Sequence, residues 1–96
     1  MKQKNEMSLG DAIKAYLKAM GLERKMLEHR LINSWEETLG KSVAASTGNL
    51  YIYKGVLFVE LRSALIRQEL MMMKTALIER LNQNVGEKII TDIVFR

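Results

Sequence analysis

The first hydrophobic pattern along the chain has helical spacing. Apolar residues recur every three or four positions at Leu9, Ile13, Tyr16, Leu17 and Met20. This spacing places them on one face of a helix. Ser8 precedes the stretch as an N-cap, Asp11 follows three residues later as in a capping box, and Gly21 stands at the position of a C-cap. The sequence therefore predicts a helix between Ser8 and Gly21.

A second helix is predicted from about Leu22 to Gly40, and its pattern extends toward Ala45. An unbroken apolar row at a spacing of four runs along it, with two further apolar residues alongside: Leu27, Leu31, Trp35 and Leu39, then Ile32 and Val43. Leu22 and Met26 lie on a different flank. Because a helix that is apolar on two flanks packs against two elements, we expect the first helix on one flank and a sheet on the other.

The pattern then changes to the alternation typical of β-strands. Two alternating runs surround the dipeptide Lys54–Gly55, one over residues 50–53 and one over residues 56–62. This arrangement predicts a β-hairpin in which Ile52 faces Leu57 and Leu50 faces Val59 on the buried side. The opposite side then carries Tyr51, Tyr53, Phe58, Glu60 and Arg62.

A third helix and a last strand complete the pattern. Ser63 is the expected cap of a helix that reaches about Asn84, with a core stripe at Ile66, Leu70, Met73, Leu77 and Leu81. After Gly86, alternation from Lys88 to Arg96 predicts a third strand. The predicted order is helix, helix, strand, strand, helix, strand. The fold class is α+β, a three-stranded sheet covered on one face by helices. The expected core contains Trp35, Leu39, Leu57, Val59, Leu70 and Leu77.

Composition narrows the chemistry. The chain has 96 residues, which predicts a single domain, over residues 8–96. Residues 1–7 are predicted to be a flexible basic segment. With no cysteine and one histidine, disulfides, thiolate metal sites and most histidine metal sites are excluded, so we expect neither a cofactor nor an enzyme. No apolar run approaches the roughly 20 residues that cross a bilayer, and no signal core follows the start. The prediction is a cytoplasmic protein without a membrane partner.

Several residues match the pattern of a known family. They are Trp35-x-x-x-Leu39-Gly40, Leu50, Gly55, Leu57-x-Val59, Ser63-Ala64, Glu69-Leu70, Lys74, Leu81-Asn82, Gly86 and Ile93-x-Phe95-Arg96. This ordered series, from Leu9 to Arg96, resembles the DciA-like family, formerly a domain of unknown function. The resemblance implies a fold similar to KH domains and a role in bacterial DNA replication, in loading or operating the replicative helicase, with some DNA binding. Longer members add a flexible basic extension after the last strand, and the linker Ser46–Asn49 lacks the proline of the family pattern.

Two surfaces are candidates for binding. The first is the aromatic side of the hairpin, with Tyr51, Tyr53 and Phe58 beside Lys54, Arg62 and Arg96. It could stack and neutralise a single-stranded nucleic acid or anchor a partner, or it could be covered by the first helix or by a second copy. The second is one flank of the third helix, Met71 and Ile78 with Arg67 and Lys74, which is either a partner contact or part of a wide core face.

Other motifs have simpler interpretations. The six glycines contain no Gly-x-x-Gly, so the backbone clamp of KH domains is absent. His29 and the Glu36–Glu37 pair are typical of a solvated helix surface. The cations Lys2, Lys4, Lys14, Lys18, Arg24 and Lys25 form either a non-specific phosphate-binding surface or one that serves solubility.

Two functional hypotheses follow. The first is a non-enzymatic adaptor in bacterial DNA replication that binds the replicative helicase and contacts DNA weakly. The second is a KH-like nucleic-acid-binding module, for DNA or RNA, with no helicase role. The net charge of +4 favours weak, non-specific contact with nucleic acid. Self-association is compatible with either hypothesis.

Overall fold

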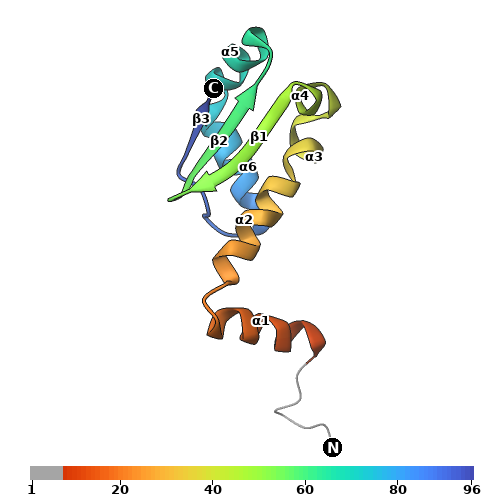
Figure 1. Cartoon of the computed structure of the whole chain (residues 1–96), viewed down its shortest axis with the longest axis vertical. Coiled ribbons are helices and arrows are strands. Elements are labelled where there is room, and N and C mark those ends of the chain that lie inside the picture. Colours follow the sequence, from red (N-terminus) through yellow and green to blue (C-terminus); the bar gives the residue numbers. More distant parts are fainter. Residues whose placement is uncertain (1–7) are drawn as a thin grey trace, which may run out of the picture.

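The computed structural model describes residues 8–96, so the predicted flexible segment 1–7 lies outside the described residues. Its elements are α1 (Leu9–Ala19), α2 (Glu23–Asn33), α3 (Trp35–Leu39), α4 (Lys41–Ala45), β1 (Thr47–Tyr53), β2 (Val56–Leu61), α5 (Ala64–Met72), α6 (Lys74–Val85) and β3 (Asp92–Phe95). The predicted α+β class with a three-stranded sheet is confirmed (Figure 1). The similarity to KH domains stays a prediction.

The sheet has the order β1-β2-β3, with β1 antiparallel and β3 parallel to the central β2. The predicted register is confirmed, because Ile52 pairs with Leu57 and Leu50 with Val59. Lys54 and Gly55 have φ angles of 50° and 78°, the left-handed values that a two-residue type I′ hairpin requires. Alternation then directs the buried side chains of β2 toward the helices.

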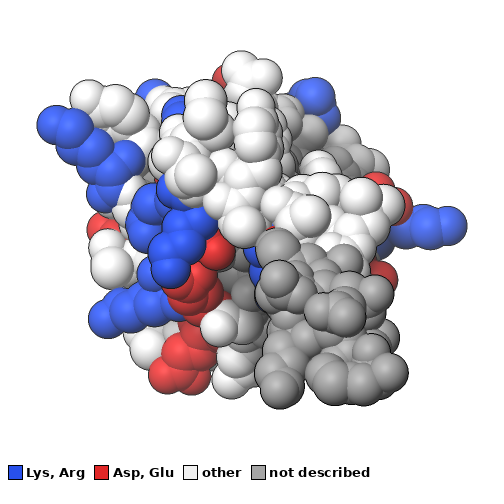
Figure 2. All heavy atoms as spheres, turned by 90° about the horizontal axis from the view of Figure 1, so that it is seen from below, with Lys and Arg blue, Asp and Glu red and all other residues white. Residues whose placement is uncertain are grey.

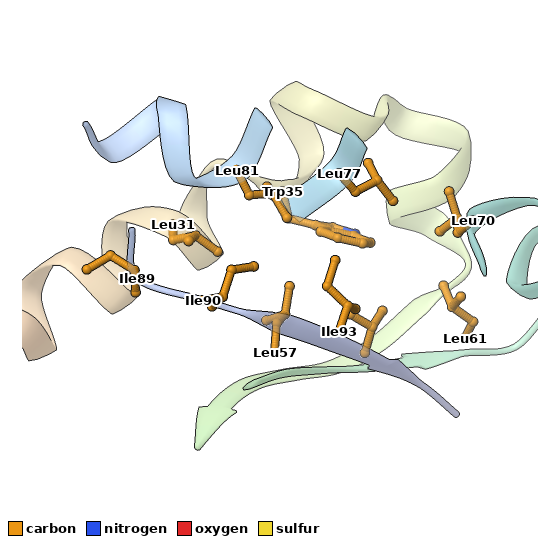
Figure 3. Packing of buried hydrophobic residues seen from close by; sticks show 11 residues of the cluster. Leu31, Trp35, Leu57, Leu61, Leu70, Leu77, Leu81, Ile89, Ile90 and Ile93 are labelled. Carbon is orange, nitrogen blue, oxygen red and sulfur yellow. The ribbon is translucent and has the colours of Figure 1, made fainter. Parts of the chain in front are cut away.

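The core lies between the sheet and the helices α2, α3, α5 and α6 (Figure 3). Its buried residues are Leu31, Trp35, Leu57, Val59, Leu61, Leu70, Leu77, Leu81, Ile89, Ile90 and Ile93. Of the six residues expected there, Leu39 is half-buried and packs against this cluster. A tight side-chain network reinforces the packing of α6 on α2 and α3, because Asn84 Nδ2 donates to Ser34 Oγ and Thr38 Oγ1 at 3.0 and 2.8 Å.

The second helix is interrupted where a single helix was predicted. It ends at Asn33, resumes as α3 at Trp35, and turns at Gly40 into α4. Ser34 Oγ donates a hydrogen bond to the Leu31 carbonyl at 2.7 Å, the local back-bonding that bends helices. Gly40 has φ 92°, outside the helical region. The prediction of a continuous helix is therefore wrong, although the apolar row along it is retained.

The third helix is also divided. Ser63 caps α5 as predicted, with its Oγ accepting from the Ile66 amide at 3.2 Å. Met73, however, separates α5 from α6 with a non-helical φ of −108° and is 49% exposed. Its assignment to the core stripe is wrong, because the change of direction at this residue takes its side chain out of line with Leu70 and Leu77.

Helix α1 does not pack as expected. Ser8 Oγ accepts from the Asp11 amide at 3.0 Å, which confirms the cap. Yet α1 has no buried residue and extends away from the sheet below the start of α2 (Figure 1). Helix α6 packs on the main apolar row of α2, where Leu31 is buried in the same core cluster as Leu81 (Figure 3). Leu22, on the other flank, is 43% exposed. The prediction that the first helix covers α2 is wrong.

The last strand is shorter than predicted and begins at Asp92. Ile89 and Ile90 are both buried, at 1% and 0% exposure, whereas strand alternation would place them on opposite faces. Asn82 holds this segment, since its Oδ1 accepts from both amides at 2.9 and 3.0 Å and its Nδ2 donates to the Ile90 carbonyl at 2.9 Å. A side chain therefore takes the place of a strand partner at Ile89 and Ile90, before the Thr91 amide bonds to the Gly55 carbonyl at 2.8 Å.

Candidate functional site

The aromatic side chains of the hairpin form a row on the side of the sheet opposite the core, which we call the open face (Tyr51, Tyr53, Lys54, Phe58 and Arg96). The rings of Tyr51 and Phe58 are stacked, with centroids 4.8 Å apart and planes 10° from parallel. Their backbones are direct neighbours across β1 and β2, which places the side chains on the same side. The pairing of strands therefore builds the stack.

Two cations lie over this aromatic row. The Arg96 guanidinium is 5.0 Å from the centroid of Phe58, and Lys54 Nζ is 5.4 Å from that of Tyr53. Tyr51 and Tyr53 are 44% and 61% exposed, while Phe58 is half-buried beneath its neighbours. An exposed aromatic surface with adjacent positive charge can stack on bases or receive apolar and acidic groups of a protein.

Arg62 and Glu60 lie toward the other end of the hairpin and have structural contacts. Arg62 Nη1 donates to the carbonyls of Ala45 and Thr47, at 2.9 and 3.4 Å. Glu60 Oε1 accepts from the Asn49 amide at 3.2 Å, where the register of β1 and β2 shifts. Both side chains therefore stabilise the start of β1. Of the residues that the sequence placed on one side of the hairpin, the aromatic ones lie on the open face, whereas Glu60 and Arg62 lie at the start of β1.

The second predicted surface is not one continuous flank. Met71 belongs to α5 and Ile78 to α6, on either side of the break at Met73, and Ile78 packs against the core. Arg67 Nη2 donates to the Leu61 carbonyl at 2.8 Å. Met71 itself is 55% exposed. The residues at the junction of α5 and α6, from Met71 to Lys74, include no glycine that would indicate a break in the sequence.

Lys74 forms an ion pair with Asp92, at 3.1 Å between Nζ and Oδ1. The pKa of Asp92 is lowered from its ordinary value of 3.8, first by the Ile93 amide that donates to the carboxylate and then by Lys74. At a pH above the ordinary pKa, the ionised Asp92 carboxylate therefore stabilises the folded state. This contribution is lost as the pH falls through the lower pKa that Asp92 has in the folded state. Because both side chains are exposed, solvent screens the pair and its contribution to stability is small.

The cations of the predicted basic surface do not form one continuous surface in the described residues. Lys2 and Lys4 lie outside the described residues, and Lys14 and Lys18 are on α1. Arg24 Nη2 donates to the Ile89 carbonyl at 2.7 Å and is therefore engaged within the fold. Figure 2 shows lysine and arginine side chains beside carboxylates when the molecule is viewed from the α1 end.

His29 and Glu36, which the sequence assigned to a solvated helix surface, line two adjoining cavities between α2, α3 and β1. Sequence reasoning did not find this groove. Its only sequence signal is the spacing that places Lys25, His29 and Glu36 along one side of the helical segment. Strand β1 had to be identified as an edge of the sheet before the groove could be located.

Comparison with known proteins identifies the family. The sequence matches the family model described as "Dna[CI] antecedent, DciA" over residues 8–95, nearly the whole chain. The chain therefore belongs to the DciA family, which confirms the resemblance seen in the sequence. No curated protein matches it.

Membership of this family is consistent with a helicase-loader role in DNA replication, and DciA is a non-catalytic family. Within residues 8–96, no three His, Asp or Glu side chains come together as a possible metal site. Among the helices of the same residues, none has both the length and the apolar character needed to cross a bilayer.

Proposed function

We propose that this protein is a non-enzymatic adaptor of bacterial DNA replication that binds the replicative helicase through its open face. Family membership supports the choice of partner, and the exposed Tyr51 and Tyr53 support the choice of surface. Exposed aromatic side chains framed by cations are the usual anchors of protein interfaces, and they tend to carry more binding energy than methionine. The stack of Tyr51 on Phe58 holds the first anchor in place without a partner, which lowers the entropic cost of binding.

Replacing Tyr51 and Tyr53 together by alanine is expected to weaken helicase binding by at least about 30-fold, which corresponds to about 2 kcal/mol. Phe58 is kept because it is half-buried and its removal would also disturb packing. Titration of the purified helicase by calorimetry measures the loss, and thermal unfolding shows that the variant remains folded.

Tyr16→Ala is the matched control, because Tyr16 is 61% exposed on α1, the same fraction as Tyr53. Its affinity for the helicase should be unchanged. Normal binding by a folded double variant would contradict the open-face assignment. If only the Tyr16→Ala variant loses affinity for the helicase, the helicase contacts α1 rather than the open face.

A second candidate function is binding of single-stranded nucleic acid without a helicase role, favoured by the stacked rings and the adjacent Arg96. For this chain we expect the Kd for a dT oligonucleotide to be about 10⁻⁵ M or weaker at physiological salt, as for non-specific phosphate contacts. Fluorescence anisotropy at two salt concentrations should show a steep loss of affinity at the higher one. Tight, salt-resistant binding would contradict this expectation and favour the second function.

A further inference from the structure

Strand β1 forms one edge of the sheet, and part of its backbone is unpaired. Within residues 8–96, only β2 pairs with β1. The two-residue type I′ turn makes Tyr53 and Val56 the pair that exchanges hydrogen bonds next to the loop. Because bonded and non-bonded pairs alternate along antiparallel strands, Tyr51 also bonds toward β2. Leu50 and Ile52 therefore direct their N–H and C=O groups outward.

A groove runs along this free edge, between β1 and the helices α2 and α3; we call it the β1 groove. It consists of two adjoining cavities of about 230 and 270 Å³. Ile32 and Leu50 line both cavities, so the two are continuous through an apolar middle. Ile52 lines the first cavity only. The side chains of Leu50 and Ile52 thus contribute to the groove, and their backbones form its open rim.

The two ends of the β1 groove differ in charge. Lys25 lines the cavity beside Ile52, and Glu36 lines the cavity beside Gly48. Glu28 also lines the first cavity, but its carboxylate lies 3.7 Å from Arg24 Nε, which offsets its charge. An occupant that is acidic at the Ile52 end and basic at the Gly48 end therefore matches the groove.

We infer that the β1 groove binds an extended segment of a partner protein, which adds to β1 as a further strand. An extended peptide presents N–H and C=O groups at every second residue, the same repeat as the outward groups of Leu50 and Ile52. A helix uses these backbone groups internally, so it cannot satisfy the strand edge. Apolar side chains at alternate positions would contact Ile32 in the middle of the groove. This goes beyond the proposed function, because it uses the strand edge rather than the open face.

The probe is the capped peptide Asp-Thr-Val-Thr-Val-Thr-Lys, added to the ¹⁵N-labelled chain. Aligned antiparallel to β1, it places its two valines opposite Ile52 and Leu50, its aspartate at the Lys25 end and its lysine at the Glu36 end. We expect the amide protons of Leu50 and Ile52 to shift downfield and to exchange more slowly with solvent. The amides of Tyr51 and Tyr53 already bond within the hairpin, so their exchange rates should not change.

Two controls test the backbone pairing and the charges separately. The same peptide N-methylated at both valines cannot donate to β1 and should bind at least about tenfold more weakly. The double variant Lys25→Glu with Glu36→Lys changes only exposed side chains and should prefer the peptide in which aspartate and lysine are exchanged. Equal binding of the methylated peptide, or an unchanged preference in the double variant, would overturn the assignment.

Two further results would also overturn it. If a dT oligonucleotide rather than the peptide moves the Leu50 and Ile52 amides, the groove is a nucleic-acid site. If the same two amides become protected with rising protein concentration and no peptide, the edge is occupied by a second copy of the chain.

Discussion

Replacement of Trp35 by alanine is expected to lower the free energy of unfolding by about 3–5 kcal/mol, the usual cost of removing a large buried aromatic ring. Trp35 is 3% exposed and lies between α6 and the sheet (Figure 3). Its Nε1 donates to Thr47 Oγ1 at 3.1 Å, and that hydroxyl donates to the Val43 carbonyl at 2.7 Å. The ring therefore connects α3, α4 and the start of β1. Urea unfolding followed by circular dichroism measures the loss.

The variant Trp35→Phe separates the two contributions of this residue. Phenylalanine keeps most of the apolar volume but cannot donate to Thr47, so we expect a loss of about 1–2 kcal/mol. Domains of this size are stable by only about 5–15 kcal/mol, so the alanine variant should lose a large share of its stability. An alanine variant as stable as the parent would refute the placement of Trp35 in the core.

Replacement of Asn82 by alanine is expected to cost about 2–4 kcal/mol, because it leaves buried backbone groups without partners. Asn82 makes three hydrogen bonds to the amides of Ile89 and Ile90 and the carbonyl of Ile90. Ile89 and Ile90 are almost fully buried, so water cannot replace these bonds without opening the segment. Urea unfolding gives the stability change, and hydrogen exchange of the two amides should become faster.

Two comparison variants make this result specific. Asn82→Asp keeps the one oxygen that accepts from both amides but replaces the donor to the Ile90 carbonyl with a second oxygen, so the two amides should exchange more slowly than in the alanine variant. Gln83→Ala changes the exposed neighbouring residue and should stay within about 0.5 kcal/mol of the parent. If Asn82→Ala is as stable as Gln83→Ala, the hydrogen bonds of Asn82 do not hold the segment before β3.

The aromatic row of the open face was predictable from sequence for a local reason. The loop Lys54–Gly55 determines the hairpin register, and the register determines which side chains share a face. Tyr51 and Phe58 therefore had to be neighbours whatever packed behind them. Arg96 over Phe58 was less determined, because it requires β3 to lie parallel to β2 across the sheet.

The β1 groove was not predictable, because a strand carries the same alternation at the edge of a sheet as it does in the centre. Leu50 and Ile52 have outward backbone groups only because β3 pairs with β2 and not with β1. The break at Met73 was hidden for a similar reason. Methionine is a good helix former, so local propensity gives no indication of a turn there.

The sequence by itself determined the type of each main element, the hairpin register, most of the core and the family, since these depend on periodicity, turn chemistry and the identity of nearby residues. The tertiary structure decided which surfaces are left uncovered. α6 rather than α1 packs against α2 in the core, and Asn82 rather than a longer strand holds Ile89 and Ile90. The physical reason is that an apolar stripe indicates only that one face of an element prefers burial. Several such stripes compete for one small core, and that competition decides which of them is buried.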